Sequence, residues 1–109
     1  MRLNVKYRPE MPYYVYVILC EGRSLYTGYT KNLKSRMRLH FSGKASRYTK
    51  MHKPKKLLYF EKFNSRSEAM RREKRIKKLS HKQKLKLTMN FTRARKRRKR
   101  RKSQDSAQI

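Results

Sequence analysis

An excess of positive charge constrains this chain more than any other feature of its sequence. The 109 residues include 34 Lys and Arg against 6 Asp and Glu, which gives a formal net charge of +28. A compact state with this excess is destabilised by self-repulsion unless an anionic partner neutralises it. Apolar residues make up 36% of the chain, below the share of roughly 45–50% in ordinary globular proteins. We therefore expect one domain with a small core and an anionic partner, which is nucleic acid, an anionic membrane or an acidic protein.

The hydropathy pattern argues against the membrane. The longest uncharged stretch, residues 11–20, is shorter than the about 20 apolar residues that a spanning helix needs. Residues 1–10 carry four charged side chains and contain no apolar segment of a signal peptide. The single cysteine, Cys20, excludes an internal disulfide and a cysteine-based zinc cluster. These features predict a reduced protein of the cytoplasm, associated with the nucleoid if its source is bacterial, with nucleic acid as the simplest partner.

The positive charge is densest near the end of the chain. Residues 93–102 read RARKRRKRRK, with nine basic residues in ten. Such a block repels itself, so we expect residues 89–109 to form a basic disordered tail until they meet an anion. A lead-in without periodicity is expected at 1–11, and a folded domain at 12–88. The tail either tethers this domain to phosphates or acts as a nonspecific solubilising or localising extension.

The residue patterns predict a small α+β domain. Three stretches rich in aromatic and β-branched residues are expected to be strands, the first two forming a hairpin: 13–20, 25–29 and 57–63. Helices are expected where apolar residues recur at helical spacing or a capping box begins a segment: 30–43, 66–79 and a last short helix from 81. Residues 44–56 are expected to be a basic loop. The order β-β-α-β-α-α implies a three-stranded antiparallel sheet flanked by helices.

Two polar side chains of the first predicted helix occupy positions where apolar ones are expected. Arg36 and His40 are four residues apart and share a face with Leu33 and Met37. That face is turned partly toward the sheet, where a basic helix has no need for Arg and His. His40 is therefore either a hydrogen-bonded buried histidine or a member of a functional site.

Glu73 is a similar exception on the second predicted helix. It falls on the apolar stripe of Ala69 and Ile76, and a buried carboxylate is costly unless something pairs with it. Arginine and a divalent cation are the two obvious partners, and carboxylate oxygen is the ligand type that Mg²⁺ and Mn²⁺ prefer. An ion pair with basic neighbours on the same helix explains Glu73 equally well.

In this order of elements the chain resembles the GIY-YIG nuclease domain, and most of all its small stand-alone bacterial members. Tyr14-Val15-Tyr16 stands at the GIY position, and Tyr26-Thr27-Gly28 at the YIG position. Residues 31–40 stand where the family has an Arg-x-x-x-His helix, and residues 66–79 where it has a helix with a metal-binding glutamate. The chain departs from the family pattern at Tyr14, in place of glycine, and at Thr27, in place of isoleucine.

The resemblance implies hydrolysis of phosphodiester bonds with one divalent cation, Mg²⁺ or Mn²⁺. It implies that Glu73 ligates the metal and that Arg36 stabilises negative charge on the scissile phosphate. Tyr16 and Tyr26 would line the site, one of them activating or positioning the attacking water. His40 would assist in proton transfer or positioning. These roles agree with what the reaction needs: a nucleophile, charge neutralisation and help for the leaving group.

We expect the nucleic acid to contact one glycine and several basic residues. Gly28 would let the backbone of the second strand approach the site closely. The expected basic contacts are Lys31, Lys34, Arg38, Lys44, Arg47, Arg95, Arg97 and Arg98. The family resemblance implies DNA that is branched, nicked or damaged, in repair or recombination, with specificity from DNA shape. A domain of this size covers little DNA, so a protein partner or the tail would help to hold it.

Two other functions fit the charge. A non-catalytic protein that binds DNA or structured RNA would need the basic residues but not Glu73, because a carboxylate without a metal repels phosphate. A protein that binds an acidic partner through its tail would keep that binding without nucleic acid. Glu73 is therefore the residue that best separates an endonuclease from a mere binder.

Overall fold

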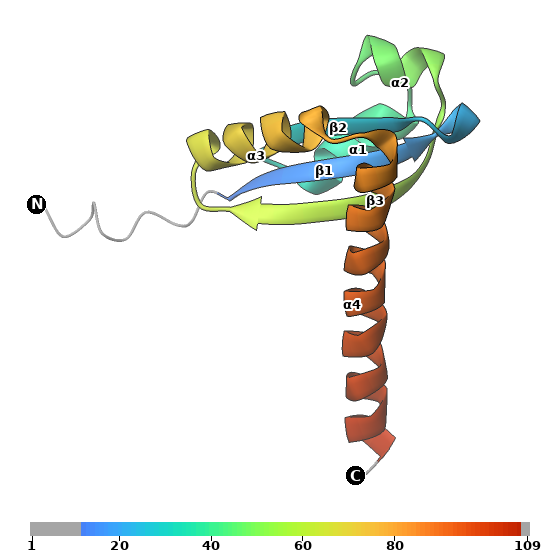
Figure 1. Ribbon diagram of the computed structural model, residues 1–109, viewed down its shortest axis with the longest axis vertical. Helices are drawn as coiled ribbons and strands as arrows, with labels where there is room; N and C mark the ends of the chain where they lie inside the picture. Colours follow the sequence, from blue (N-terminus) through green and yellow to red (C-terminus); the bar gives the residue numbers. More distant parts are fainter. Residues whose placement is uncertain (1–11, 108–109) are drawn as a thin grey trace, which may run out of the picture.

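The structure is a computed structural model, and it describes residues 12–107, with side chains through residue 98. The expected lead-in at 1–11 lies outside the described residues. The described chain forms strands β1 (Tyr13–Cys20), β2 (Leu25–Thr30) and β3 (Pro54–Phe63), a short 3-10 turn (Glu21–Arg23), and helices α1 (Leu33–Phe41), α2 (Arg47–Met51), α3 (Arg66–Lys78) and α4 (His81–Ala107). Figure 1 shows their arrangement.

The three strands form one antiparallel sheet in the order β2-β1-β3. This confirms the predicted α+β fold and its hairpin. The apolar strand β1 lies in the centre because both of its faces are covered: Val15, Tyr16, Val17 and Ile18 are all at most 1% exposed. Strand β2 is an edge strand, and its register places Gly28 opposite Tyr16.

Each face of the sheet has its own small core. On one face Tyr16, Ile18 and Cys20 pack with Leu33 and Met37 of α1. On the other face Val15 and Val17 pack with Ala69 and Ile76 of α3. The alternation of side chains along β1 thus sends odd and even residues to different helices. The two helices approach β2 from opposite faces, and the site described below lies where they meet its edge.

The segment 44–56, expected to be a loop, contains a helix and the start of a strand. Helix α2 begins because the Ser46 side chain accepts a hydrogen bond from the Thr49 backbone N–H, at 3.1 Å, which is a standard N-cap. Strand β3 starts at Pro54, three residues earlier than expected. A proline is tolerated at the first position of an edge strand, since no ladder donor is lost there. The many charges of this segment concealed both elements.

The expected short last helix and disordered tail are replaced by one continuous helix, α4. Its start is the predicted capping box: Ser80 N–H donates to the Gln83 side chain at 2.9 Å, and Gln83 N–H donates to Ser80 Oγ at 3.2 Å. Arg and Lys are good helix formers, so the basic run continues the helix. In Figure 1 α4 projects from the sheet as a rod.

The first turns of α4 belong to the folded domain, so a boundary at 88 is too early. Thr88 is 3% exposed, and Leu87 and Phe91 pack against the core on the α3 face. The Phe91 ring also contacts Tyr59 and Phe60, with 5.2 Å between centroids in each pair. Neighbouring strand residues point to opposite faces, so Phe91 lies at the outer edge of β3. Helix α4 therefore covers an edge that is otherwise open to pairing with another chain.

Among the described residues, no helix is both long and apolar enough to cross a membrane. The long helix α4 is too polar.

Candidate active site at the edge of strand β2

A cleft of about 650 Å³ lies along β2, between α1 and α3. Six residues that the sequence patterns point to line it: Tyr16 from β1, Tyr26 and Gly28 from β2, Lys31 just after β2, Arg36 from α1 and Glu73 from α3. The cleft is also lined by Tyr13, Tyr29, Thr30, Asn32, Ser35, Leu39 and Arg66. A single carboxylate thus faces several cationic and phenolic groups, which is a suitable surrounding for a phosphate.

Gly28 makes room for Tyr16 to reach this edge. A Cβ atom added at Gly28 would lie 2.5 Å from the Tyr16 hydroxyl oxygen and 2.7 Å from the ring carbon that bears it. Both distances are far below van der Waals contact, so the Tyr16 side chain crosses β2 only because position 28 has no side chain. A glycine is therefore needed at position 28 so that the Tyr16 side chain can approach the β2 backbone closely. Gly28 lies within β2, where the tyrosine-x-glycine motif predicts it.

Behind the cleft, a chain of buried polar groups holds the Tyr16 hydroxyl. Tyr16 Oη lies 2.7 Å from His40 Nε2, and His40 Nδ1 lies 2.8 Å from Thr49 Oγ1. Thr49 Oγ1 in turn lies 2.8 Å from Ser46 Oγ. His40 and Thr49 are at most 1% exposed. The chain links β1 through α1 to the short helix α2.

His40 is buried and hydrogen-bonded, and it reaches the cleft only through Tyr16. Burial, together with the nearby Arg36 charge, lowers the pKa of His40 from 6.5 to about 4. The imidazole is therefore neutral at physiological pH, with one ring nitrogen donating and the other accepting. The sequence allowed His40 to be either a buried, hydrogen-bonded histidine or a member of a functional site. In the structure His40 is buried and contacts Tyr16, which lines the cleft.

The surroundings of Tyr16 keep its phenol protonated. Burial raises the pKa of Tyr16 strongly, the neighbouring Tyr26 raises it further, and the Arg36 charge opposes the rise. The Tyr16 and Tyr26 rings are 6.2 Å apart. A phenol in this state is a hydrogen-bonding group that positions a water molecule, and it becomes a base only when more positive charge is added nearby.

Glu73 has a cation partner and also faces the cleft. Its side chain is 15% exposed, and Glu73 Oε1 lies 3.5 Å from Lys77 Nζ, one turn further along α3. The sequence allowed Glu73 either an ion pair on its own helix or a place in the site. The structure has both, since Glu73 pairs with Lys77 and lines the same cleft as Tyr16 and Arg36.

The residues present fit a single hard cation. Within the part of the chain that the structure describes, no three His, Cys, Asp or Glu residues come together as a metal-binding group. Mg²⁺ is commonly held by one or two carboxylates, with water and substrate phosphates completing its shell. Glu73 provides the single carboxylate of this cleft.

Of the nine expected nucleic-acid contacts, only Gly28 and Lys31 line the cleft. Lys34 and Arg38 line a mostly apolar groove of about 810 Å³ on another side of α1. The Arg95 guanidinium lies over the Phe60 and Phe91 rings. The remaining four are exposed: Lys44, Arg47, Arg97 and Arg98. The expected contacts therefore spread over several sides of the molecule.

The residue patterns did not point to Arg66 or Thr49, and both contribute to this site. Arg66 lines the cleft, and its guanidinium lies 3.5 Å from the Tyr29 hydroxyl. Its signal was available, because Arg66 precedes Glu73 by seven residues and so shares its face of α3. Thr49 gave no signal, since its role depends on the unexpected helix α2.

The chain is similar to known proteins in sequence and in fold. The family model described as the GIY-YIG catalytic domain matches residues 12–86. The UPF0213 protein SH2523 of Staphylococcus haemolyticus is 52% identical over 75 residues, covering 69% of this chain and 92% of that protein. The UPF0213 protein OB0043 of Oceanobacillus iheyensis is 49% identical over 75 residues, covering 69% and 87%. The solution NMR structure of the protein EF2693 from E. faecalis superposes with a TM-score of 0.52 at 37% identity, covering 74% of this chain and 86% of that one.

Proposed function

The chain belongs to the GIY-YIG catalytic domain family, and we propose from this that it is an endonuclease that hydrolyses phosphodiester bonds in DNA with one divalent cation. The observation that carries the proposal is the convergence of Tyr16, Arg36 and Glu73 on one cleft from three different elements. A protein that only binds phosphates gains nothing from a carboxylate in that position. A nuclease uses it to hold a cation beside the scissile phosphate.

The proposed roles follow from the contacts of each side chain. Glu73 would hold Mg²⁺ or Mn²⁺, which when bound supplies Lewis acidity and positive charge next to the phosphate. Arg36 would present its planar fork of donors to the phosphate oxygens. The Tyr16 hydroxyl would accept a hydrogen bond from the attacking water, and Tyr26 would close the cleft beside it.

We assign His40 to holding Tyr16. In this proposal Nδ1 donates to Thr49 and Nε2 accepts from the Tyr16 hydroxyl, which would leave the lone pairs of the Tyr16 oxygen for the attacking water. A pKa of about 4 makes His40 a weak base, so storing the proton of the water on this ring is unfavourable. His40 is in this view a positioning residue, which acts through Tyr16.

The proposed substrate is structured DNA, branched or nicked, in repair or recombination. The basic residues outside the cleft support DNA that extends well beyond the cut phosphate. Specificity would come from DNA shape, and a protein partner would target the domain. The proposed location is the cytoplasm, with the nucleoid as the place of action in a bacterium.

A non-catalytic binder of DNA or structured RNA is the second candidate. This binding function is favoured by the positions of the nine expected nucleic-acid contacts, because seven of these residues lie outside the cleft. The two functions differ in their need for Glu73. In a binder, removing this negative charge strengthens nucleic-acid binding and has no other effect.

A cleavage assay tests the proposal. Labelled flap, nicked, branched and plain duplex DNA are incubated with Mg²⁺ or Mn²⁺ and the wild type, Glu73→Gln or Tyr16→Phe. We expect cation-dependent cutting that each substitution lowers by about 100-fold or more. Glu68→Gln is the matched control, because Glu68 lies on the same helix and is exposed outside the cleft; it should cut like the wild type. Tight binding without cutting of any substrate by the wild type would contradict the proposal.

A further inference from the structure

A row of aromatic rings starts in the cleft at β2, crosses α2 and ends at the surface. The Tyr26 ring, which lines the cleft, stacks on Tyr48 of α2 with 5.7 Å between centroids and 30° between planes. The Tyr48 ring lies 4.6 Å from the His52 ring. On its inner side Tyr26 is 5.0 Å from His40. Rings therefore continue from the candidate active site to the outer end of α2.

The outer end of this row is exposed. Tyr48 is 36% exposed and Met51 is 73% exposed, and His52 at the end of the row is exposed as well. Packing α2 against the sheet needs only the inner face of Tyr48, which contacts Tyr26. This packing does not explain why a helix of five residues exposes part of a tyrosine and most of a methionine to solvent.

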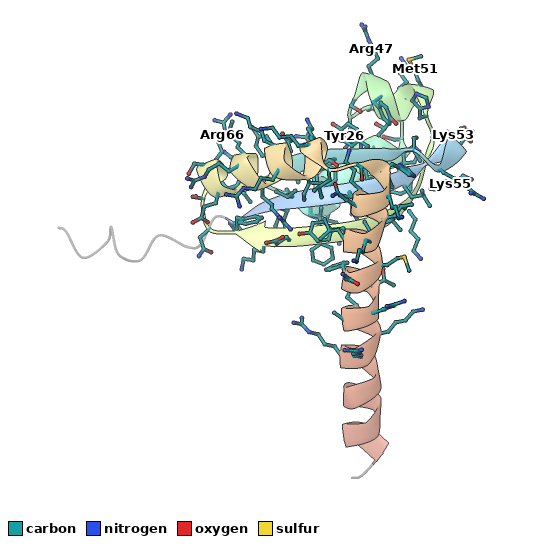
Figure 2. The ribbon with its side chains drawn as sticks, in the orientation of Figure 1. Tyr26, Arg47, Met51, Lys53, Lys55 and Arg66 are labelled. Atoms are coloured by element: carbon teal, nitrogen blue, oxygen red, sulfur yellow. The ribbon has the colours of Figure 1, made fainter. Side chains whose placement is uncertain are left out.

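The surroundings of this end are strongly cationic. Residues 44–56 contain six Lys and Arg, and the sequence has no Asp or Glu between Glu21 and Glu61. Figure 2 shows Arg47 and Met51 on the side of α2 that faces away from the sheet, with Lys53 and Lys55 at the same end of the molecule. Exposed rings surrounded by positive charge are the usual means of binding unpaired nucleotides, because bases stack on the rings and phosphates meet the cations.

The cleft therefore has two different ends. Figure 2 shows Arg66, at the start of α3, on the opposite side of Tyr26 from α2. The Arg66 end offers a guanidinium and the nearby Lys31, which suit a phosphate backbone. The α2 end offers ring faces, which a base can use only when it is not already stacked within a duplex.

We propose that α2 and His52 at its C-terminal end form a stacking platform for one or two unpaired nucleotides next to the phosphate in the cleft, with His52 as the exposed ring and Tyr48 as the ring that supports it. The inference rests on the proposed function and narrows its substrate class to DNA in which a single-stranded segment adjoins the site of cutting. Stacking would hold that segment, and the lysines of 44–56 would neutralise its phosphates. Fully paired DNA would bind through its backbone alone.

Binding measured without a divalent cation tests the platform independently of cleavage. Two DNAs of equal length are compared in EDTA, one fully paired and one with three unpaired nucleotides at a junction, the first of them 2-aminopurine. We expect Tyr48→Ala to weaken binding of the unpaired DNA by about five- to tenfold and to abolish the change in 2-aminopurine fluorescence. Binding of the paired DNA should change by less than about twofold, and Tyr48→Phe should behave like the wild type.

Two further variants separate stacking from charge and from folding. Lys50→Ala, on the same helix, removes a cation and should weaken binding of both DNAs equally. His52→Ala removes the outer ring only, so it leaves the Tyr26 contact intact and should selectively weaken binding of the unpaired DNA. An equal loss on both DNAs for Tyr48→Ala and His52→Ala, or no loss for either, would overturn the proposal. If the wild type prefers the unpaired DNA but cuts none of the substrates, the stacking platform is supported and the proposed nuclease activity is contradicted.

Discussion

Tyr16 combines a structural and a chemical role that usually conflict. Its ring is a core residue on the α1 face, 1% exposed, while its hydroxyl reaches the edge of the sheet and lines the cleft. The two roles are compatible because Gly28 leaves space above β2 and because His40 satisfies the hydroxyl inside the protein. The position of the Tyr16 hydroxyl is thus determined by packing.

Replacing Gly28 with alanine tests this dependence. The new Cβ would meet the Tyr16 hydroxyl and ring, so the buried ring must move and its bond to His40 must break. We expect Gly28→Ala to lower the free energy of unfolding by about 1–3 kcal/mol and to lower single-turnover cleavage by about tenfold or more. Urea denaturation and a single-turnover cleavage assay measure the two effects.

Gly43→Ala is the matched control for that substitution. Gly43 has a φ of +77° and open space around its Cβ position, so alanine there adds backbone strain of about 1 kcal/mol without touching Tyr16. It should lower stability and leave cleavage unchanged. Wild-type cleavage by Gly28→Ala would mean that the position of Tyr16 is not needed for the reaction.

The buried His40 predicts a loss of stability in mild acid. Its pKa is about 4 in the folded protein against 6.5 when unperturbed, so the unfolded state takes up the proton first as the pH falls. The contribution is complete above pH 6.5 and declines toward pH 4. We expect a loss of about 2 kcal/mol between pH 7 and pH 5. Urea denaturation at both pH values measures it, and in His40→Gln, though less stable at both, this pH-dependent part should disappear. An equal pH dependence in the variant would contradict the assignment.

Residue patterns revealed those site residues that break a rule. Arg36, His40 and Glu73 stand out because a polar group on an apolar stripe needs a partner. The structure supplies one for two of them, since His40 bonds to Tyr16 and Glu73 pairs with Lys77, while Arg36 faces the cleft. Arg66 and Thr49 break no rule. An arginine in a chain with 34 basic residues and a threonine in a polar segment are ordinary, so only the fold distinguishes them.

Most helices and strands could be predicted because short-range sequence features determine them. The hairpin, α1, α3 and both helix starts at Ser65 and Ser80 follow from β-branched runs, apolar spacing and capping side chains. A high density of charge predicts irregular structure in residues 44–56 and 89–109, and this expectation is wrong for helix α2 and for the length of α4. Charge opposes compactness more than it opposes helix formation, because a helix satisfies its own backbone hydrogen bonds and its side chains point outward.

Helix α4 should divide into a folding part and a binding part near Thr92. Its core contacts are made up to Phe91, and the residues beyond it are mostly basic. A chain ending at Thr92 should melt within a few degrees of the full chain, keep single-turnover cleavage at saturating protein, and bind DNA more weakly. A chain ending at residue 86, where the family match ends, loses Leu87 and Phe91 and should be less stable by about 3 kcal/mol or more.

Thermal melting and DNA titration of the two truncated chains check this division. Loss of cleavage at saturation in the chain ending at Thr92 would show that the distal part of α4 takes part in catalysis. Equal stability of the two truncated chains would show that the Phe91 contacts with Tyr59 and Phe60 contribute nothing to the fold.

For the whole molecule, the same charges should act in opposite directions on folding and on binding. The net charge of +28 is only locally compensated: Glu73 pairs with Lys77, and Glu61 with Arg72 at 3.3 Å. Self-repulsion therefore lowers the stability of the free protein and is screened by salt, since the Debye length falls from about 10 Å at 0.1 M to about 3 Å at 1 M. Binding to DNA releases counterions, so salt weakens it.

Raising NaCl from 0.05 to 0.5 M should consequently increase the melting temperature of the free protein by about 5 °C or more while weakening DNA binding steeply. The logarithm of affinity should fall linearly with the logarithm of salt concentration, with a slope of about −0.9 for each neutralised phosphate. The chain ending at Thr92 lacks the nine basic residues of 93–102, so both its melting increase and its binding slope should be smaller. Scanning fluorimetry and fluorescence anisotropy on the two chains give the two melting increases and the two binding slopes.

A melting temperature that does not rise with salt would contradict this prediction. It would mean that the basic side chains are spaced widely enough to avoid mutual repulsion, so that DNA is needed for function but not for stability.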